Sequence, residues 1–435
     1  MRWVSATGFS TSGTRLPAGS HHSRRLTLPK TVCWWRSVTP SRTSRVTWRR
    51  VPDRILVRLN RGEALTPSRY HFSWRSPRPY DPRPMLCSLF LALLAFPVCQ
   101  DASVDSVAVA QAEKQELVGL AWAVVRAGSP LHRGTFGFAD REKSRPVDDD
   151  TLFRWASISK PLTAIAAMQL VEEDRLDLDR NVREYVPEFP EKPQPINSLQ
   201  LLAHQGGIVH YTNGPVIRTE VEYEVEHPFE DVILALDTFK ESPLVAEPGT
   251  KYAYTTHGYI LLGAVVQRAG GEPYWKQVKE RIAKPLGMQS LRPDYPWTRT
   301  SERARGYRRV LGVIVPSTDT DVSWKLPGGG FTSNISDLAR FAEGLMGEKL
   351  VKPATREKMW TRQPLPERKT SSYGLGFSVG KAHEQRLISH SGSQEATRTL
   401  MRLFPDRGTA VVLMSNCEYA ILKPIALAME RVLFE

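Results

Sequence analysis

The chain has 435 residues, 41% of them hydrophobic, so it is long enough to bury a core as one large domain or two ordinary ones. Its formal net charge of +13 would indicate a nucleic-acid or acidic-membrane partner if the charge were spread evenly. Residues 1–84, however, carry 17 Lys and Arg against three acids, and the rest of the chain carries 42 against 43, so no nucleic-acid partner is indicated for the body of the protein.

The basic leader, residues 1–84, combines Arg with Ser, Thr, Pro and Trp and shows no sustained apolar period, so we expect no packed core there. Three interpretations remain open: a basic nucleic-acid-binding arm, an organelle transit segment, or translated sequence upstream of the true start. We favour the last, because Met85 opens a segment of a different kind.

Residues 85–99 form an apolar run that is too short to span a bilayer and matches the hydrophobic region of a signal peptide in length. Residues 85–102 are therefore interpreted as signal-peptide-like. This predicts export to the periplasm or out of the cell, and no stable membrane span in the mature chain. If residues 1–84 are a genuine transit segment, the alternative location is the mitochondrion.

The remaining residues, 103–435, are expected to form one domain that begins and ends with strands. Periodicity predicts a helix over 103–118 and a hairpin of strands over 119–126 and 131–138. Further helices are expected over 157–173, 199–203, 229–236, 258–269, 272–282 and 335–346. Strands are expected over 373–379, 386–390, 397–404 and 409–414, before a closing helix over 419–433.

These two strand clusters can pair into one mainly antiparallel sheet, with the long helical insertion packed beside it. The expected fold class is therefore α+β: a mainly antiparallel sheet flanked by helices, a helical lobe, and a cleft between sheet and lobe that would hold the active site.

The first chemical motif is a serine and a lysine three residues apart at the start of a helix, Ser157 and Lys160. This spacing puts both on one helix face, so the serine Oγ can reach the lysine amine, and Pro161 suits a first helical turn. For Lys160 to act as a base, burial or a neighbouring positive charge must lower its pKa. The bland alternative is that Ser157 only caps the helix, and the same spacing recurs at Ser378 and Lys381 on an expected strand.

The second motif places Tyr254 and Thr256 on a short extended stretch before a helix. A tyrosine beside a lysine can relay a proton to a leaving group. In isolation, an ordinary half-buried aromatic would explain Tyr254 equally well.

The third motif, His390-Ser-Gly392-Ser393, lies at the end of an expected strand. Gly392 would let a substrate backbone lie along the strand edge, and the amides of Ser393 and Ser157 could form an oxyanion hole. His390 alone would be explained by a surface histidine with satisfied hydrogen bonds.

The order Ser-x-x-Lys, Tyr-x-Thr and a His-led triplet ending in Gly resembles the class C beta-lactamase and D,D-peptidase superfamily. Stretches 185–191, 201–211 and 328–333, with Asp337-Leu338, are most similar to its mitochondrial-type serine beta-lactamase-like subgroup. The resemblance runs from about Ser103 to the C-terminus.

The resemblance implies that Ser157 is the acylated nucleophile, Lys160 the proton acceptor and Tyr254 its partner. His390 would position substrate and tune the Lys160–Tyr254 pair, and the amides of Ser157 and Ser393 would bind the oxyanion. The implied mechanism is a two-step acyl transfer that needs no cofactor.

Two departures from the pattern bear on the substrate. Thr256 stands where efficient beta-lactamases of this class carry Asn, and His390 replaces the lysine of many of them, so fixed positive charge is reduced at neutral pH. We therefore expect an esterase or peptidase acting on a small-molecule or peptide substrate, with weak beta-lactam reactivity at most.

Two other functions compete. The pattern Gly376-Phe-Ser378-Val-Gly380 matches the nucleophile elbow of α/β-hydrolases, but the sequence after it is a poor helix start and no His follows His390. A member of the same fold could also serve as a non-catalytic binding or scaffold protein. The histidines show no zinc-binding spacing, so no metal site is predicted, and the sequence does not indicate an oligomeric state.

Overall fold

The structure, a computed structural model, describes residues 103–129, 131–366 and 369–435. The basic leader and the signal-peptide-like segment predicted before residue 103 lie outside the described residues, so both stay predictions. Within the described ranges, no helix combines the length and the apolar character needed to cross a membrane.

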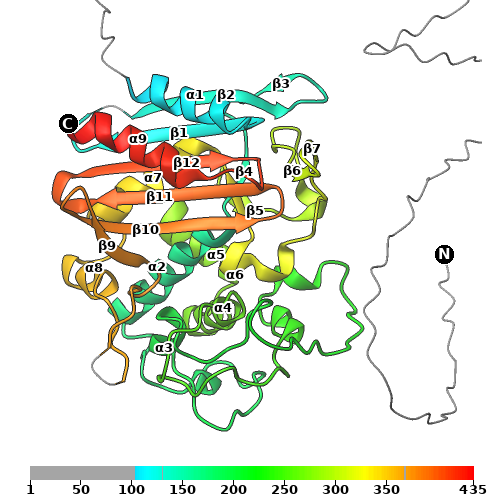
Figure 1. Ribbon diagram of the computed structural model, residues 1–435. Coiled ribbons are helices and arrows are strands. Elements are labelled where there is room, and N and C mark those ends of the chain that lie inside the picture. Colours follow the sequence, from blue (N-terminus) through cyan, green and yellow to red (C-terminus); the bar gives the residue numbers. More distant parts are fainter. Residues whose placement is uncertain (1–102, 130, 367–368) are drawn as a thin grey trace, which may run out of the picture. The chain divides into compact units, whose positions relative to one another are not determined.

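A seven-stranded antiparallel sheet runs in the order β3-β2-β1-β12-β11-β10-β9 (Figure 1). Its strands are β1 (Gly119–Arg126), β2 (His132–Asp140), β3 (Arg145–Pro146), β9 (Ser378–Ala382), β10 (Gln385–Gln394), β11 (Thr397–Phe404) and β12 (Thr409–Ser415). The pairing of β1 with β12 joins the two ends of the domain in one sheet. The predicted antiparallel sheet is confirmed.

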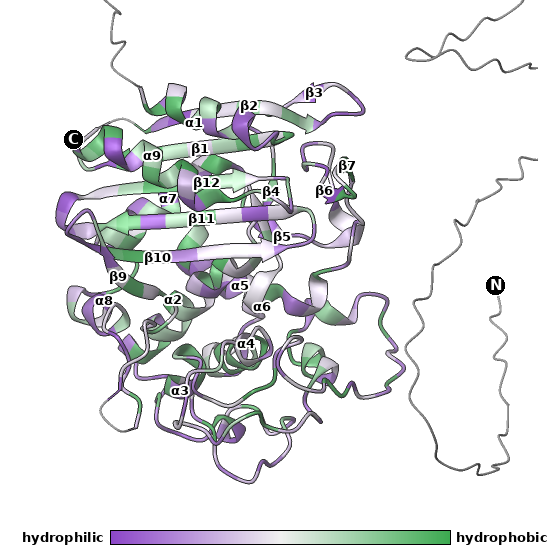
Figure 2. Cartoon of the chain, in the orientation of Figure 1, coloured by the Kyte–Doolittle hydropathy of each residue, from purple (hydrophilic) through white to green (hydrophobic). Residues whose placement is uncertain are grey.

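Helices cover both faces of this sheet. Helices α1 (Val104–Lys114) and α9 (Leu422–Phe434) pack on one face, and α7 (Ile335–Met346) packs on the other. Strand β1 is buried on both sides because alternate residues enter different cores: Leu120, Trp122 and Val124 face α1 and α9, and the residues between them face α7. Figure 2 shows α9 with both hydrophobic and hydrophilic residues, as suits a helix that covers one face of a sheet.

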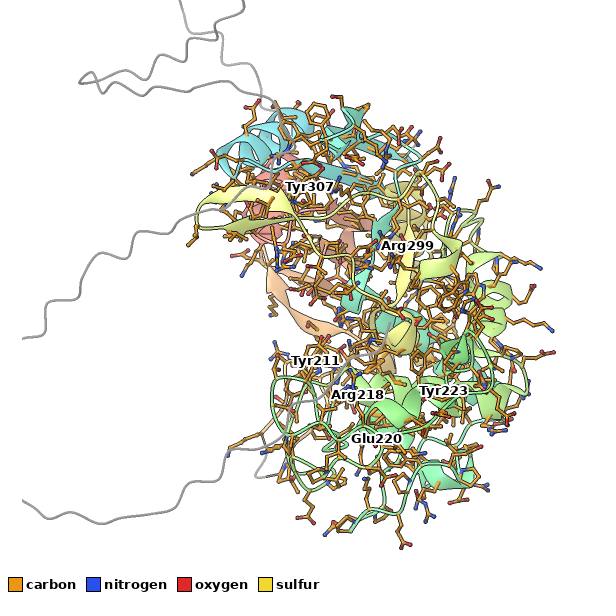
Figure 3. The ribbon with its side chains drawn as sticks, turned by 90° about the vertical axis from the view of Figure 1, so that its right-hand side faces the viewer. Tyr211, Arg218, Glu220, Tyr223, Arg299 and Tyr307 are labelled. Atoms are coloured by element: carbon orange, nitrogen blue, oxygen red, sulfur yellow. The ribbon has the colours of Figure 1, made fainter. Side chains whose placement is uncertain are left out.

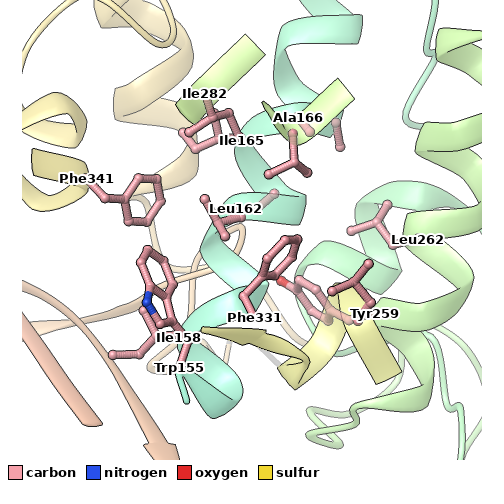
Figure 4. Close-up of a cluster of buried hydrophobic side chains, with 14 of the residues drawn as sticks. Trp155, Ile158, Leu162, Ile165, Ala166, Tyr259, Leu262, Ile282, Phe331 and Phe341 are labelled. Carbon is pink, nitrogen blue, oxygen red and sulfur yellow. The ribbon is translucent and has the colours of Figure 1, made fainter. Parts of the chain in front are cut away.

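The helical lobe is built around α2 (Ser159–Glu172), which is buried on nearly all sides because it lies among the other helices. Its side chains Leu162 and Ile165 join Trp155, Phe331 and Phe341 in the large core cluster (Figure 4). The other helices are α3 (Ser198–Leu202), α4 (His257–Gly270), α5 (Tyr274–Val278), α6 (Leu326–Gly329) and α8 (Pro353–Met359).

Three expected elements differ from the structure. Residues 229–236 form two short 3-10 turns, η3 (Pro228–Glu230) and η4 (Leu234–Thr238), in place of an α-helix. The strand expected from residue 373 begins only at Ser378, since Gly376 has a φ of 93° that breaks the extended chain. The helix expected over 272–282 continues after α5 as a π-helical turn, Lys279–Ala283.

Two small sheets were not predicted from the sequence. One has three strands in the order β4 (Phe153–Arg154), β8 (Phe331–Ser333) and β5 (Arg292–Pro293), and the other is the hairpin of β6 (Tyr307–Val310) and β7 (Val313–Pro316). The first of them matters for the site, because β4 leads directly into the turn that carries Ser157.

A buried ion pair ties α9 to the sheet. Glu430 of α9 is fully buried and pairs with Arg402 of β11, while His383 Nε2 lies 3.0 Å from a Glu430 carboxylate oxygen. We expect Glu430→Gln to lower the free energy of unfolding by about 3 kcal/mol, because it leaves the Arg402 charge buried without a partner. Urea unfolding would measure this. The double variant Arg402→Met with Glu430→Met should lose less than the single variant, and an equal or larger loss would refute this explanation.

Candidate active site

The candidate nucleophile Ser157 lies in the 3-10 turn η1 (Ala156–Ile158), immediately before α2. Ala156 has a φ of 48°, in the left-handed region that a non-glycine residue rarely adopts. Neighbouring hydrogen bonds hold this strained turn: the Trp155 amide donates to the Phe331 carbonyl at 2.8 Å, and Thr399 Oγ1 donates to the Trp155 carbonyl at 2.8 Å. These hydrogen bonds hold the start of the turn that carries Ser157 to β8 and β11.

The structure brings Lys160 and Ser157 together. Lys160 Nζ lies 3.1 Å from Ser157 Oγ, 3.1 Å from Thr256 Oγ1 and 2.7 Å from the Gly328 carbonyl oxygen. These three partners match the three donors of an ammonium group. When the amine is neutral, one position becomes a lone pair, and Ser157 Oγ is a hydroxyl that could donate to it.

Burial lowers the pKa of Lys160 well below its ordinary value of 10.5, and the positive charge of Lys325 lowers that pKa further. Lys160 is fully buried, and its Nζ lies 4.8 Å from the centre of the Tyr254 ring. A neutral amine near neutral pH is the form that can accept a proton.

Tyr254 lies on the stretch of chain that leads into α4. Burial raises the pKa of its phenol above the ordinary value of 10, and a hydrogen bond with Ser157 opposes that rise. Tyr254 therefore stays protonated at neutral pH, and its phenol oxygen can accept a hydrogen bond from Ser157.

Thr256 serves Lys160 directly, because its hydroxyl accepts one of the lysine's hydrogen bonds. Its amide donates to His210 Nδ1 at 3.1 Å. Thr256 was predicted to bind substrate, and in the structure its hydroxyl contacts Lys160 Nζ.

His390 is buried, and its ring is engaged on both nitrogens. Nδ1 lies 2.9 Å from the Ser391 carbonyl oxygen and Nε2 lies 2.9 Å from the Tyr373 hydroxyl, so Nδ1 carries the proton and Nε2 accepts from tyrosine. Burial, with the charge of Lys160 as a second cause, lowers the pKa of His390 to about 3. The imidazole is neutral at physiological pH and supplies no fixed positive charge to a substrate.

Gly392 lies where β10 passes closest to the nucleophile turn. A Cβ at this position would lie 2.1 Å from Thr399 Oγ1 and 2.4 Å from the Trp155 carbonyl oxygen, so only glycine fits. Ser393 follows on β10, is exposed, and pairs in register with Arg398. The glycine thus allows the end of β10 to run beside Ser157.

A pocket of about 410 Å³ opens beside this strand end, between the sheet and the lobe. Its lining includes Tyr211, His257, Trp324, Lys325 and Ser393. Ser393 therefore belongs both to the strand beside Ser157 and to the pocket wall, as expected of a substrate site.

The rival serine, Ser378, lacks the setting of a nucleophile elbow. It begins strand β9 and pairs with Ser389 of β10, and no helix follows it. An elbow needs a strand-to-helix turn at the serine, so the α/β-hydrolase hypothesis is wrong for this chain.

Several residues around the site were missed as functional candidates. His204 is fully buried with its ring centre 4.3 Å from that of Tyr254 and 4.8 Å from that of Tyr373, and so links Tyr254 to the tyrosine that holds His390. His204 and Tyr211 lie within stretch 201–211, which contributed to the family resemblance but was given no functional role. Lys325 lies three residues before Gly328, the first residue of stretch 328–333, which also contributed to the family resemblance.

Comparison with known proteins agrees with this geometry. A Beta-lactamase family profile matches residues 104–432. The mitochondrial serine beta-lactamase-like protein LACTB of Homo sapiens is 28% identical over 395 residues, covering 67% of this chain and 72% of that protein. Esterase EstB of Burkholderia gladioli is 34% identical over 197 residues, 43% of this chain and 50% of that protein. The octameric penicillin-binding protein homologue from Pyrococcus abyssi superimposes with a TM-score of 0.65 and 25% identity, covering 76% of each chain.

These likenesses confirm the fold class and the resemblance expected from the sequence motifs.

In the part of the chain that the structure describes, no group of three or more His, Cys, Asp or Glu side chains is placed to hold a metal ion.

Proposed function

Since this chain belongs to the Beta-lactamase family, whose hydrolase fold it shares with penicillin-binding and esterase relatives, we propose that it is a serine hydrolase that cleaves ester or amide bonds through an acyl-enzyme on Ser157. The observation that carries the proposal is the contact of Ser157 Oγ with Lys160 Nζ, because burial gives this lysine the lowered pKa of a base.

In the acylation step, Ser157 Oγ attacks the substrate carbonyl carbon and its proton passes to the neutral amine of Lys160. The carbonyl oxygen becomes an oxyanion, for which the amides of Ser157 and Ser393 are the proposed donors. The bond to the leaving group then breaks, and the leaving group takes a proton from Tyr254 or from protonated Lys160.

In the second step, water attacks the acyl carbonyl and gives its proton to the same pair of side chains. Ser157 regains its proton and leaves as the hydroxyl. This releases the acid product and regenerates the free enzyme. Tyr254 suits this relay because it bonds Ser157 and its phenol stays protonated. His390 acts in this scheme as a positioning residue, through Tyr373.

The substrate class is proposed to be esters, amides or peptides, with weak beta-lactam reactivity at most. The neutral imidazole of His390 and the engagement of Thr256 with Lys160 support this, because neither offers charge or a free amide to a beta-lactam. We expect a p-nitrophenyl ester to be turned over with a kcat/KM at least about tenfold above that of a chromogenic cephalosporin, since each such lost contact is worth about 1 kcal/mol or more. Parallel steady-state assays would show this, and a cephalosporin preference would contradict it.

The pH dependence tests the base. The unprotonated amine of Lys160 exists only above its folded-state pKa, so activity should be lost as pH falls through that pKa, which lies well below 10.5. The neighbouring imidazoles of His210, His257 and His390 have pKa values lowered to about 3, 4 and 3, so none of them would produce a limb near neutrality.

Lys325→Met removes the second cause of the lowered Lys160 pKa, so the acid limb of kcat/KM should move to higher pH. Profiles of wild type and variant on one neutral ester would measure the shift. A limb that does not move, or moves to lower pH, would show that Lys160 is not the group being titrated.

A further inference from the structure

Lys325 is a buried cation to which no ion pair is assigned in the part of the chain that the structure describes. It is 7% exposed at the end of the 3-10 turn η7 (Ser323–Lys325), and within the described ranges its Nζ has neither a hydrogen-bond acceptor nor an ion-pair partner. Its Nζ lies 5.5 Å from the centre of the Trp324 ring and 6.0 Å from that of Tyr211. The exposed carboxylate of Glu395 acts on the Lys325 charge without forming an ion pair with it. Buried charges in proteins are ordinarily paired, so an ammonium on the wall of a pocket with no ion-pair partner favours a partner from outside the chain.

The pocket that Lys325 faces, here called the Trp324 pocket, is the space of about 410 Å³ beside the end of β10. Two contacts connect it to the reaction centre. Ser393 lines it, one residue beyond the glycine that touches the nucleophile turn. Tyr211 also lines it, and the neighbouring His210 accepts the amide of Thr256, whose hydroxyl accepts from Lys160. The pocket therefore adjoins the Ser157 region closely enough for one substrate to extend into both.

A second cation stands at the rim of the pocket. Arg218 is exposed, and its guanidinium carbon lies 6.0 Å from the centre of the same Trp324 ring. The indole therefore has the buried Lys325 near it at the floor of the pocket and the exposed Arg218 near it at the rim. Figure 3 shows Arg218 and Tyr211 in the same part of the lobe.

The two acids of the lining, Asp321 and Glu395, are both exposed, and Asp321 accepts the Ser323 amide at 2.8 Å. Water screens exposed charges far more than buried ones, so the buried charge at the floor is positive.

We propose that the Trp324 pocket binds a carboxylate carried by the substrate, with Lys325 as its buried partner and Arg218 at the rim, so that the enzyme prefers anionic substrates to neutral ones of equal length. The proposal rests on the proposed function and names its substrate class. Ion-paired hydrogen bonds are about twice as strong as neutral ones, and the apolar wall of Trp324 would strengthen the pair by excluding water.

The protonation state of Lys325 agrees with this role. Burial lowers its pKa to about 8, while the charge of Glu395 opposes that fall and the charge of Arg154 adds to it. The ammonium is therefore the main form at pH 7. Many beta-lactamases of this class have a lysine at the position of His390, which is neutral here. In the proposed pocket the positive charge comes from Lys325 of η7 instead.

The test compares two p-nitrophenyl esters of suberic acid, one with a free carboxylate at the far end and one with a methyl ester there. Hydrolysis in the presence of Ser157→Ala full-length protein is subtracted as background. The ratio of kcat/KM for the anionic ester to that for the neutral ester should exceed one in wild type and fall by about tenfold or more in Lys325→Met, the effect of one lost hydrogen bond to a charged group. Because the ratio compares two substrates on one enzyme, a change in the Lys160 pKa cancels.

Lys349→Met is the matched control, since Lys349 is exposed and away from the pocket, and its ratio should equal that of wild type. Should Lys325→Met fail to fold, Arg218→Gln changes only an exposed side chain and should lower the same ratio. Inhibition of wild type by monomethyl suberate, compared with dimethyl suberate, should show the same preference for the anion. A ratio that is unchanged in the folded variants would overturn the pocket assignment alone, whereas wild type that hydrolyses neither ester and takes no serine-directed label would overturn the proposed function as well.

Discussion

Replacement of Ser157 by alanine is expected to abolish both turnover and labelling by a fluorophosphonate probe. The probe forms a bond to an activated serine Oγ with loss of fluoride, so the intact mass of wild type should rise by one adduct. Removal of a catalytic serine costs about 10⁴-fold or more in kcat, because the remaining oxyanion donors and binding contacts rescue only a small part of the rate. Mass spectrometry and a p-nitrophenyl ester assay on the same samples would measure both effects.

Ser378→Ala is the matched control for this experiment, since Ser378 is the other serine with a lysine three residues on. It should keep the label and the activity, because Ser378 pairs within the sheet and lies outside the Lys160 contact set. Loss of the label in Ser378→Ala alone would move the nucleophile to β9. A folded wild type that takes no label would favour the non-catalytic scaffold.

Replacement of Lys160 by methionine is expected to lower kcat/KM by about 10²- to 10⁴-fold, the usual contribution of a general base. Methionine fills a similar volume in the fully buried site without supplying a lone pair for the Ser157 proton. The acid limb of the pH profile should disappear with the amine. Steady-state assays from acid to alkaline pH would measure the rate and the limb together, and a melting curve would show that the variant is folded.

Lys381→Met is the control for Lys160, because it removes an exposed lysine that follows Ser378 at the same spacing. Its rate and pH profile should match those of wild type. If Lys160→Met keeps the acid limb, another group is the base, and Tyr254 would be the next candidate because it bonds Ser157.

The parts of the site that could be predicted from sequence depend on local geometry. Ser157 and Lys160 lie on one helix face because they are three residues apart, whatever surrounds that helix. Strand β1 could be predicted because it is a continuous apolar run, as suits a strand buried on both faces, and α7 could be predicted from its helical period. The family resemblance followed from motif order, which is also a property of the chain alone.

Short elements could not be predicted in the same way. Strands β4 and β5 have two residues each, too few for an alternating pattern to be visible. Residues 229–236 have helical spacing, but local propensity is weak and tertiary contacts broke the segment into two 3-10 turns.

The chemistry of the side chains was decided by tertiary structure. The carbonyl that accepts from Lys160 belongs to Gly328, 168 residues away, and the tyrosine that orients His390 lies on a different segment of the chain. A pKa depends on burial and on the charges nearby in space, so the lowered pKa of Lys160, the neutral state of His390 and the unpaired ammonium of Lys325 required the folded arrangement. The sequence by itself determined which groups carry the chemistry, and long-range packing decided their protonation states and which of them faces a substrate.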